Sequence, residues 1–225
     1  MPSQHKLPIV VLLSGSGSNL QAIIDEAQAG RLDVEIRAVI SNKAAAFGLQ
    51  RAQQAGIETR VLEHTAFDSR EAFDRALVEL IDTYHPGLVV LAGFMRILSD
   101  AFVDHYHGRL LNIHPSLLPK YQGLKTHQRA IDAGDTEAGA SVHFVSRELD
   151  GGPVIMQASV PLQTDDDAES LAQRVLGVEH KLYPQAIQLF ATGEIEQRDN
   201  QAFYKGQPLN QPLSRNPEPL LTSNC

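Results

Sequence analysis

Two polar side chains stand where an apolar stretch gives way to a proline-punctuated loop, in "LLNIHPSLLPKYQG" from Leu110 to Gly123. Asn112 and His114 are two residues apart, and side chains two apart on a strand point to the same face. An amide NH2 and a protonated imidazole aimed together form an oxyanion hole, which stabilises negative charge on a carbonyl oxygen under attack. His114 serves this purpose as an imidazolium, or as a general acid near neutral pH. The pair therefore predicts chemistry at a carbonyl group.

A carboxylate near the imidazole would favour its charged form. The best candidate is Asp150 in "ELDGGP", an acid followed by two glycines on a predicted turn between two strands. A purely structural role is the alternative for all three residues. A lone histidine at a strand end is usually structural, and Asp-Gly is among the commonest turn signals.

Metal and serine-hydrolase chemistry fit the sequence less well. His105 and His107 in "HYHG" lie at i and i+2 of a predicted helix, where side chains do not face each other. The sequence has no cysteine cluster and no His-Glu-x-x-His motif, so we expect no metal. It also lacks the G-x-S-x-G motif of the serine hydrolases.

A glycine loop, "SGSGSN" at Ser14–Asn19, joins the first predicted strand to the first predicted helix. In a doubly wound sheet such a turn lies at the carboxyl end of a strand, where the first N–H groups of the helix can hold an anion. The loop has no lysine for a Walker A motif, and Leu20 replaces the third glycine of the dinucleotide fingerprint. The remaining functional interpretation is that Gly17, Ser18 and Asn19 bind a single phosphate group. A tight turn with Ser18 or Asn19 as helix cap is the structural alternative.

Composition limits the class of protein. The chain has 225 residues, 43% of them hydrophobic and 20% charged, which suits one large globular domain. No apolar run approaches the roughly 20 residues of a membrane helix, and the N-terminal run ends in the glycine loop, which favours a core strand over a signal peptide. The net charge of -8 argues against a nucleic-acid partner. Because Cys225 is the only cysteine, we expect a cytoplasmic protein without internal disulfides.

The order of predicted elements indicates an α/β fold. Strands are predicted at 8–13, 34–41, 58–63, 87–93 and 110–114, with helices at 18–30, 44–56 and from Ser69 to a stop at Pro86. This alternation predicts an open, mostly parallel, Rossmann-like sheet with helices on both faces. The second half predicts an antiparallel portion: strands at 140–145 and 153–162, a helix from about 168 to 191, and short strands within 193–209. Residues 214–225 have no periodicity and are predicted to be disordered.

Several motifs in this order resemble the folate-dependent formyltransferases. They are "SGSGSNLQAII", "SNKAAAFGLQRA", "AGFMRIL", "LLNIHPSLLPKYQG" and "VHFVSRELDGGPVIMQ". The similarity covers about residues 7–213, and within the family it narrows to the enzymes of purine synthesis that formylate glycinamide ribonucleotide. The resemblance implies a single formyltransferase domain at 7–213, with a nucleotide-binding half at about 7–108 and a folate and catalytic half at about 109–213.

The resemblance also implies a reaction. The amine of glycinamide ribonucleotide would attack the formyl group of the co-substrate 10-formyltetrahydrofolate, with no metal. Asn112 and protonated His114 would stabilise the oxyanion, and Asp150 with a water would relay a proton from the amine to the folate N10. His143, in "SVHFV", would support the water or the pair; a satisfied strand histidine is the alternative.

Binding residues follow from the same motifs. The ribonucleotide would be held by Gly17, Ser18, Asn19 and Glu179, where the carboxylate suits a cationic amine. The folate would be held by Arg70, Met95, Arg96, Ile97, Leu98, Asn112, Ser146, Arg147, Glu148, Leu149 and Asp150. Structural alternatives are a solvated helix charge for Glu179 and a surface helix arginine for Arg70.

One position departs from the family, since Gln122 stands where we expect proline after "LLPKY".

Three rival functions were weighed against this reaction. A methionyl-tRNA formyltransferase would need an added basic C-terminal domain. A formyltetrahydrofolate hydrolase usually carries an N-terminal regulatory domain, for which a first strand at about residue 8 leaves no room. A non-catalytic nucleotide-binding module would not need Asn112, His114 and Asp150 together. Monomer and homodimer both remain open.

Overall fold

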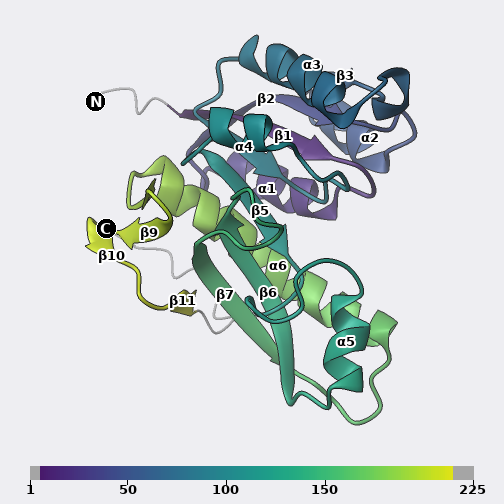
Figure 1. Ribbon diagram of the computed structural model, residues 1–225, viewed down its shortest axis with the longest axis vertical. Helices are drawn as coiled ribbons and strands as arrows, with labels where there is room; N and C mark the ends of the chain where they lie inside the picture. The colour runs from purple at the N-terminus through teal and green to yellow at the C-terminus, as the bar shows by residue number, and fades with distance from the viewer. Residues whose placement is uncertain (1–5, 215–225) are drawn as a thin grey trace.

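The computed structural model describes residues 6–214, which form a large sheet with helices on both faces and a small sheet beside it (Figure 1). The strands of the large sheet are β1 (Leu7–Leu13), β2 (Val34–Ser41), β3 (Thr59–Val61), β4 (Leu88–Leu91), β5 (Leu110–His114), β6 (Glu137–Phe144), β7 (Val154–Pro161) and β11 (Leu213–Ser214). The helices are α1 (Ser18–Gln28), α2 (Phe47–Gln54), α3 (Arg70–Asp82), α4 (Asp100–His105), α5 (Thr126–Asp132) and α6 (Ala168–Ala191), with a 3-10 turn η1 (His64–Ala66). The small sheet contains β8 (Ile195–Arg198), β9 (Gln201–Tyr204) and β10 (Gln207–Pro208).

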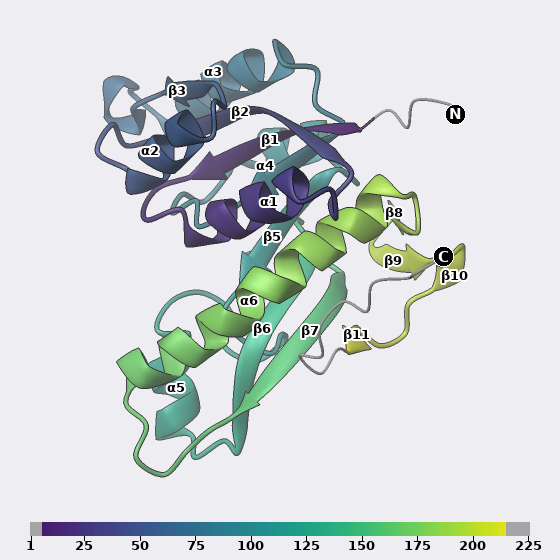
Figure 2. The same ribbon diagram turned by 180° about the vertical axis from the view of Figure 1, so that it is seen from behind.

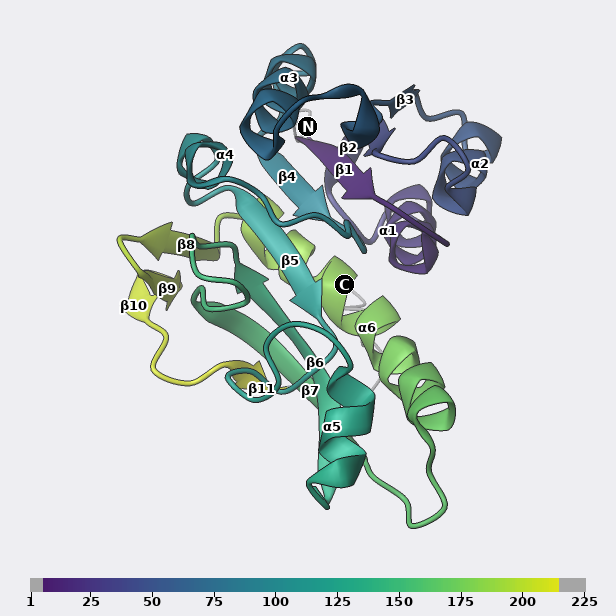
Figure 3. The ribbon, with the colours of Figure 1, turned by 45° about the vertical axis from the view of Figure 1, so that its right-hand side comes forward.

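The large sheet changes from parallel to antiparallel at β5. Its strand order is β11-β7-β6-β5-β4-β1-β2-β3. The pairs β1·β2, β1·β4 and β4·β5 are parallel, whereas β5·β6 and β6·β7 are antiparallel. The arrows of β1, β4 and β5 point toward the same edge of the sheet (Figure 3). The predicted fold class, a mostly parallel sheet followed by an antiparallel portion, is confirmed.

Two apolar layers cover the sheet. One contains residues of α1, α2 and α6, and the other contains residues of α3 and α4. Seen from behind, α6 crosses the face of β5, β6 and β7 and lies beside α1 (Figure 2). Leu111 and Ile113 of β5 belong to the α6 layer, and Leu110 belongs to the other. Because side chains alternate along a strand, Asn112 and His114 face away from α6.

Local details differ from the predicted elements at several places. The third strand is shorter than predicted, 59–61, and β6 begins at 137, ahead of the predicted start at 140. Helix α5 was not predicted. Ser69 caps α3 as predicted, with its hydroxyl accepting from the N–H of Ala72 at 3.1 Å.

Two predictions about chain segments are wrong at their boundaries. The N-cap of α1 is Gly17 in a left-handed conformation, and neither Ser18 nor Asn19 caps the helix. Ser214, placed in the predicted disordered tail, lies in β11 and pairs with Gln157 of β7. The rest of that predicted tail, 215–225, is outside the described residues. Within 6–214, no helix is both long and apolar enough to cross a membrane.

Candidate active site

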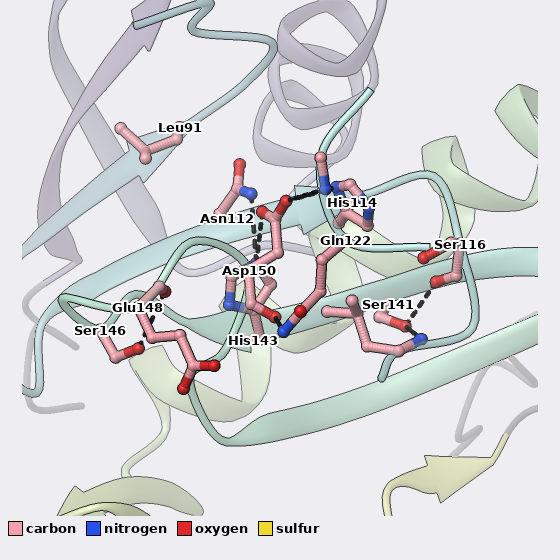
Figure 4. Close-up of polar contacts among 12 residues, drawn as sticks. Leu91, Asn112, His114, Ser116, Gln122, Ser141, His143, Ser146, Glu148 and Asp150 are labelled. Carbon is pink, nitrogen blue, oxygen red and sulfur yellow. Dashed lines mark hydrogen bonds and ion pairs between the residues drawn. The ribbon is translucent and has the colours of Figure 1, made fainter. Parts of the chain in front are cut away.

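Four polar side chains meet at the β5–β6 junction, on the face turned away from α6 (Figure 4). Asn112 and His143 lie opposite each other on the two strands, with Nδ2 of Asn112 3.2 Å from Nε2 of His143. Asp150 reaches them from the loop after β6. Its Oδ2 lies 3.4 Å from Nδ1 of His114, and its Oδ1 lies 3.8 Å from Nε2 of His143. The structure thus brings together the four residues named as catalytic.

His143 is a neutral acceptor toward Asn112. Its Nδ1 lies 2.9 Å from the carbonyl oxygen of Phe144, so Nδ1 carries the proton. Burial lowers the pKa of His143 to about 4, and the hydrogen bond to Phe144 and the charge of Asp150 offset this only in part. The unprotonated Nε2 accepts one N–H of the Asn112 amide, which leaves the second N–H for another acceptor.

His114 faces an oxygen at each ring nitrogen. Its Nε2 lies 2.9 Å from the main-chain oxygen of Tyr121, and its Nδ1 faces Asp150. Since a carbonyl oxygen can only accept, Nε2 carries a proton. The contact with Asp150 is satisfied when His114 is doubly protonated or when the two groups share one proton. At 3.4 Å, the contact is longer than the roughly 2.7–2.9 Å of a tight charge-assisted hydrogen bond.

The segment 121–123 forms hydrogen bonds with both His114 and Asp150. The main-chain N–H of Gly123 donates to Oδ2 of Asp150 at 2.9 Å, and Nε2 of Gln122 lies 3.3 Å from the Asp150 main-chain oxygen. Gln122, at the position where we expected proline, therefore contacts the turn that carries the carboxylate. Tyr121 and Asp150 both have left-handed backbones, at φ 58 and φ 50. Such conformations cost roughly 1–2 kcal/mol each for residues other than glycine, so each loop helps to hold the other in a strained shape.

Gly152 lets the Asp150 turn approach β6. A Cβ at this position would lie 2.0 Å from the main-chain oxygen of Phe144, closer than any side chain can come. On the other side of the glycine, the carbonyl of Pro153 accepts from the N–H of Phe144 at 3.0 Å. The second glycine of "DGG" is thus required by close packing, which places Asp150 over the strand that carries His143.

The predicted phosphate loop surrounds the first turn of α1. Gly17 is left-handed at φ 70, and a Cβ on it would lie 2.5 Å from Cα of Gly48. The N–H of Gln21 makes the first helical bond, to the oxygen of Gly17. The three preceding N–H groups, 18–20, remain unused by the helix. Together with the positive end of the helix dipole, they can bind an anion.

A cation at this loop comes from α2 and was missed by the sequence analysis. Arg51 donates from Nε to the main-chain oxygen of Ser16 at 2.9 Å, and its Nη1 lies 3.2 Å from Oε1 of Gln21. The Phe47 ring lies 4.9 Å from the guanidinium and supports it. A single arginine on a helix gives no distinctive signal in one sequence.

Glu179 reaches the same loop from α6. Its Oε2 accepts from Nδ2 of Asn19 at 2.7 Å, and both side chains are buried. Burial raises the pKa of Glu179, and the hydrogen bond from Asn19 opposes this. Among residues 6–214, the buried Oδ1 atom of Asn19 has no hydrogen-bond partner, and Glu179 forms no ion pair. A buried carboxylate next to an unsatisfied amide oxygen has the electrostatics of a site for a positively charged group.

The residues assigned to folate lie on two loops and at one helix start. Residues 95–98 follow β4, residues 146–150 connect β6 to β7, and Arg70 begins α3. The N–H of Met95 donates to Oγ of Ser14 at 2.8 Å, which fixes the first loop to the end of β1. The Met95 side chain itself is exposed.

The side chains of these loops divide into apolar and cationic groups. Met95, Ile97 and Leu149 are large, apolar and exposed, as expected of loops that meet an apolar ligand. Arg147 forms an ion pair with Asp104 of α4 at 2.6 Å, and Arg70 pairs with Glu71 at 3.2 Å. The two arginines therefore have acidic partners and do not join the catalytic cluster.

A cavity of about 360 Å³ lies behind the loop that follows β5. It is lined by 115–121, by residues of α5 and by the start of β6. None of the four proposed catalytic side chains lines it. Among residues 6–214 no group of three or more His, Cys, Asp or Glu is arranged to hold a metal ion.

The sequence of this chain matches the formyl transferase family over residues 7–187. The chain therefore belongs to the formyl transferase family. It is 60% identical to the phosphoribosylglycinamide formyltransferase of Escherichia coli K12 over 201 residues, which cover 89% of this chain and 95% of the relative. Within the family, it therefore belongs to the phosphoribosylglycinamide formyltransferases.

Two other comparisons agree with this assignment. A solved phosphoribosylglycinamide formyltransferase from Coxiella burnetii superposes with a TM-score of 0.89 at 54% identity, over 92% of this chain and 98% of the other. The human trifunctional purine biosynthetic protein adenosine-3 is 45% identical over 197 residues, which are 88% of this chain and only 20% of that protein.

Proposed function

We propose that this chain transfers the formyl group of 10-formyltetrahydrofolate to the amine of glycinamide ribonucleotide. The observation that carries the proposal is the cluster of Asn112, His114, His143 and Asp150 on one face of the β5–β6 junction. Relatives named as phosphoribosylglycinamide formyltransferases support the substrates. The proposed domain spans 7–213. Its first half, 7–108, supplies the loop that binds the nucleotide, and its second half, 109–213, supplies the catalytic residues. Glu179 is an exception, because it lies in the second half and contacts the ribonucleotide.

The reaction proceeds by direct attack of the amine nitrogen on the formyl carbon. A new C–N bond forms, and the carbonyl oxygen becomes an oxyanion. The free N–H of Asn112 donates to this oxygen, and the positive charge of His114 stabilises it. Removing one such donor typically costs roughly 2.7–4 kcal/mol of barrier. The neutral Nε2 of His143 keeps the Asn112 amide turned toward the substrate.

Proton transfer completes the reaction. The amine loses a proton as the C–N bond forms, and the folate N10 gains one as its bond to the formyl carbon breaks. Asp150 takes up the first proton, directly or through a water, and the pair that it forms with His114 returns a proton to N10. The 3.4 Å contact between the two groups must shorten, or be bridged by a water, for a proton to pass between them.

The ribonucleotide is bound at both of its ends. The N–H groups at the start of α1 take the phosphate in the loop that contains Gly17, Ser18 and Asn19, beside the guanidinium of Arg51. The carboxylate of Glu179, which accepts from Asn19 of this loop, faces the ribose and the amine. The pterin of the folate packs on the exposed apolar side chains of the two loops after β4 and β6. Arg70 meets the folate carboxylates by exchanging its partner Glu71.

Formyl release from 10-formyltetrahydrofolate, with and without glycinamide ribonucleotide, tests this function. Release that requires the ribonucleotide and yields its formylated product is the expected result. Formate released without the ribonucleotide would indicate a hydrolase. No release in either reaction would indicate a binding protein without catalytic activity.

A further inference from the structure

The hydroxyl of Tyr183 ties two adjacent strands of the sheet together, at the last residue of β4 and the second residue of β5. Tyr183 is fully buried on α6, and its Oη lies 2.9 Å from the main-chain oxygen of Leu91 and 3.0 Å from that of Leu111. These carbonyls belong to the adjacent parallel strands β4 and β5, in which Leu91 is paired with Asn112. One phenolic hydrogen is therefore shared by two main-chain acceptors, one where β4 ends and one directly before Asn112 in β5.

These two peptide groups lead directly to the proposed site. The carbonyl of Leu111 belongs to the peptide bond that continues into Asn112, and the carbonyl of Leu91 precedes the loop that carries Met95. Tyr183 belongs to the apolar layer of α6, whereas the side chain of Asn112 projects from the opposite face. The phenol thus holds, from behind, the backbone from which the oxyanion donor projects.

The same stretch of α6 also reaches the ribonucleotide loop. Glu179 lies one helical turn before Tyr183 and accepts from Asn19. Burial raises the pKa of Tyr183 well above its ordinary value, so the hydroxyl stays a neutral donor. A single turn of helix therefore contacts the loop proposed for phosphate, the strand that leads to the folate loop and the strand that carries Asn112.

We propose that Tyr183 is a positioning residue, whose hydroxyl sets the place of Asn112 relative to the two bound substrates. The inference rests on the proposed function, because it gives Asn112 the role of oxyanion donor. Tyr183 does not touch the reacting atoms. Since the oxyanion forms only during the reaction, a displaced Asn112 lowers turnover without weakening the binding of the ribonucleotide.

Tyr183→Phe removes the hydroxyl and keeps the ring. We expect kcat and the kcat/KM for the ribonucleotide to fall together by about tenfold, which corresponds to about 1.4 kcal/mol, with the KM for the ribonucleotide unchanged. Tyr106→Phe is the matched control. Tyr106 is also fully buried, and its hydroxyl donates to Oδ1 of Asp82 at 2.9 Å on the other face of the sheet. The control should lose stability and keep kcat, with both variants assayed well below their unfolding midpoints.

A double-mutant cycle tests whether Tyr183 acts through Asn112. In an Asn112→Ala background, Tyr183→Phe should change kcat less than about twofold, because the positioned group is gone. The same tenfold factor in both backgrounds would overturn the inference, as would an unchanged kcat for Tyr183→Phe alone. An equal loss of kcat in Tyr106→Phe would mean that lost stability, and not the position of Asn112, lowers kcat in Tyr183→Phe, and would also overturn the inference.

An NMR readout keeps the inference separate from the proposed function. The side-chain amide resonances of Asn112, assigned by their loss in Asn112→Ala, should shift in Tyr183→Phe and stay in place in Tyr106→Phe. Resonances that do not move in Tyr183→Phe would overturn the positioning role even if the wild-type chain formylates the ribonucleotide. A wild-type chain that does not transfer formyl groups would refute the proposed function, whatever these resonances do.

Discussion

Asp150 faces His114 across 3.4 Å while its own backbone is held in a left-handed conformation at φ 50. The conformation is unfavourable for an aspartate, yet it carries the carboxylate back over the strands instead of out into solvent. The N–H of Gly123 fixes the carboxylate from the opposite loop. Local strain therefore accompanies the closest approach of the two groups that we propose to exchange a proton.

Replacing either member of this pair should abolish turnover while the fold survives. Asp150→Asn and His114→Ala should each lower kcat by about 10²–10⁴-fold, the usual contribution of a positioned acid or base. Steady-state rates, with calorimetry of ribonucleotide binding, measure the effect. Asp132→Asn, an exposed aspartate on α5, is the control and should keep wild-type kcat. Full activity of Asp150→Asn at neutral pH would disprove the proton relay.

Glu179→Gln should weaken the binding of the ribonucleotide and increase the stability of the protein. The KM for the ribonucleotide should rise by roughly tenfold or more, because a charge-assisted contact is lost. The folded state raises the pKa of Glu179, so stability falls as pH rises above the ordinary value of 4.5 and the buried group ionises. A glutamine removes this cost, and its NH2 can donate to the unpartnered Oδ1 of Asn19.

Urea unfolding at pH 8 tests this gain in stability, which should be about 1 kcal/mol. Glu169→Gln, at an exposed position in the first turn of the same helix, is the control: it should keep the KM and lose rather than gain stability, because it removes an acid from the positive end of the helix dipole. A Glu179→Gln variant that is less stable at pH 8, with an unchanged KM, would contradict the assignment of this carboxylate to the substrate amine.

His143 should make the stability of the protein depend on pH. Its pKa is lowered from 6.5 to about 4 in the folded state, so its contribution is complete above pH 6.5 and is lost as the pH falls toward 4. Unfolding free energies at pH 7 and pH 5 should therefore differ less in His143→Gln than in the wild type. His107→Gln, at an exposed histidine, should leave the difference unchanged. An identical pH dependence in wild type and His143→Gln would show that His143 titrates alike in both states.

Gly152→Ala should impair catalysis through the loop that carries Asp150. The added Cβ would lie 2.0 Å from the Phe144 oxygen, so the loop must move away from β6. We expect kcat to fall by at least about tenfold with ribonucleotide affinity retained, since the phosphate loop is not affected. Gly177→Ala is the matched control, because its Cβ meets nothing within 4 Å on α6. It should keep kcat and gain up to about 1 kcal/mol of stability.

The predictions that rest on short-range rules agree with the structure. The two-residue period of a strand places Asn112 and His114 on one face, and the Asp-Gly-Gly turn supplies Asp150 to that face. The alternation of apolar strands with helices gave the order and type of the main elements. Each of these features is determined by neighbouring residues, so one sequence is enough to read it.

Contacts made by the backbone or across long separations were not predictable in this way. The Tyr121 carbonyl that accepts from His114 has no side-chain signature. Arg51 reaches the glycine loop through the packing of α2 on α1, which periodicity does not specify. The cap of α1 was misplaced because Gly17 takes the cap position in a left-handed conformation, which leaves the N–H groups of the next residues open.

The late position of α6 in the chain has a consequence for biosynthesis. The helix follows every strand that carries a proposed catalytic side chain, yet it supplies Glu179 to Asn19 and the Tyr183 hydroxyl to β4 and β5. A nascent chain therefore leaves the ribosome with β1 to β7 ahead of the helix that covers one face of β5 to β7. Assembly of the ribonucleotide site must await synthesis of α6, and its closure joins residues that are remote in sequence, a slow class of folding event.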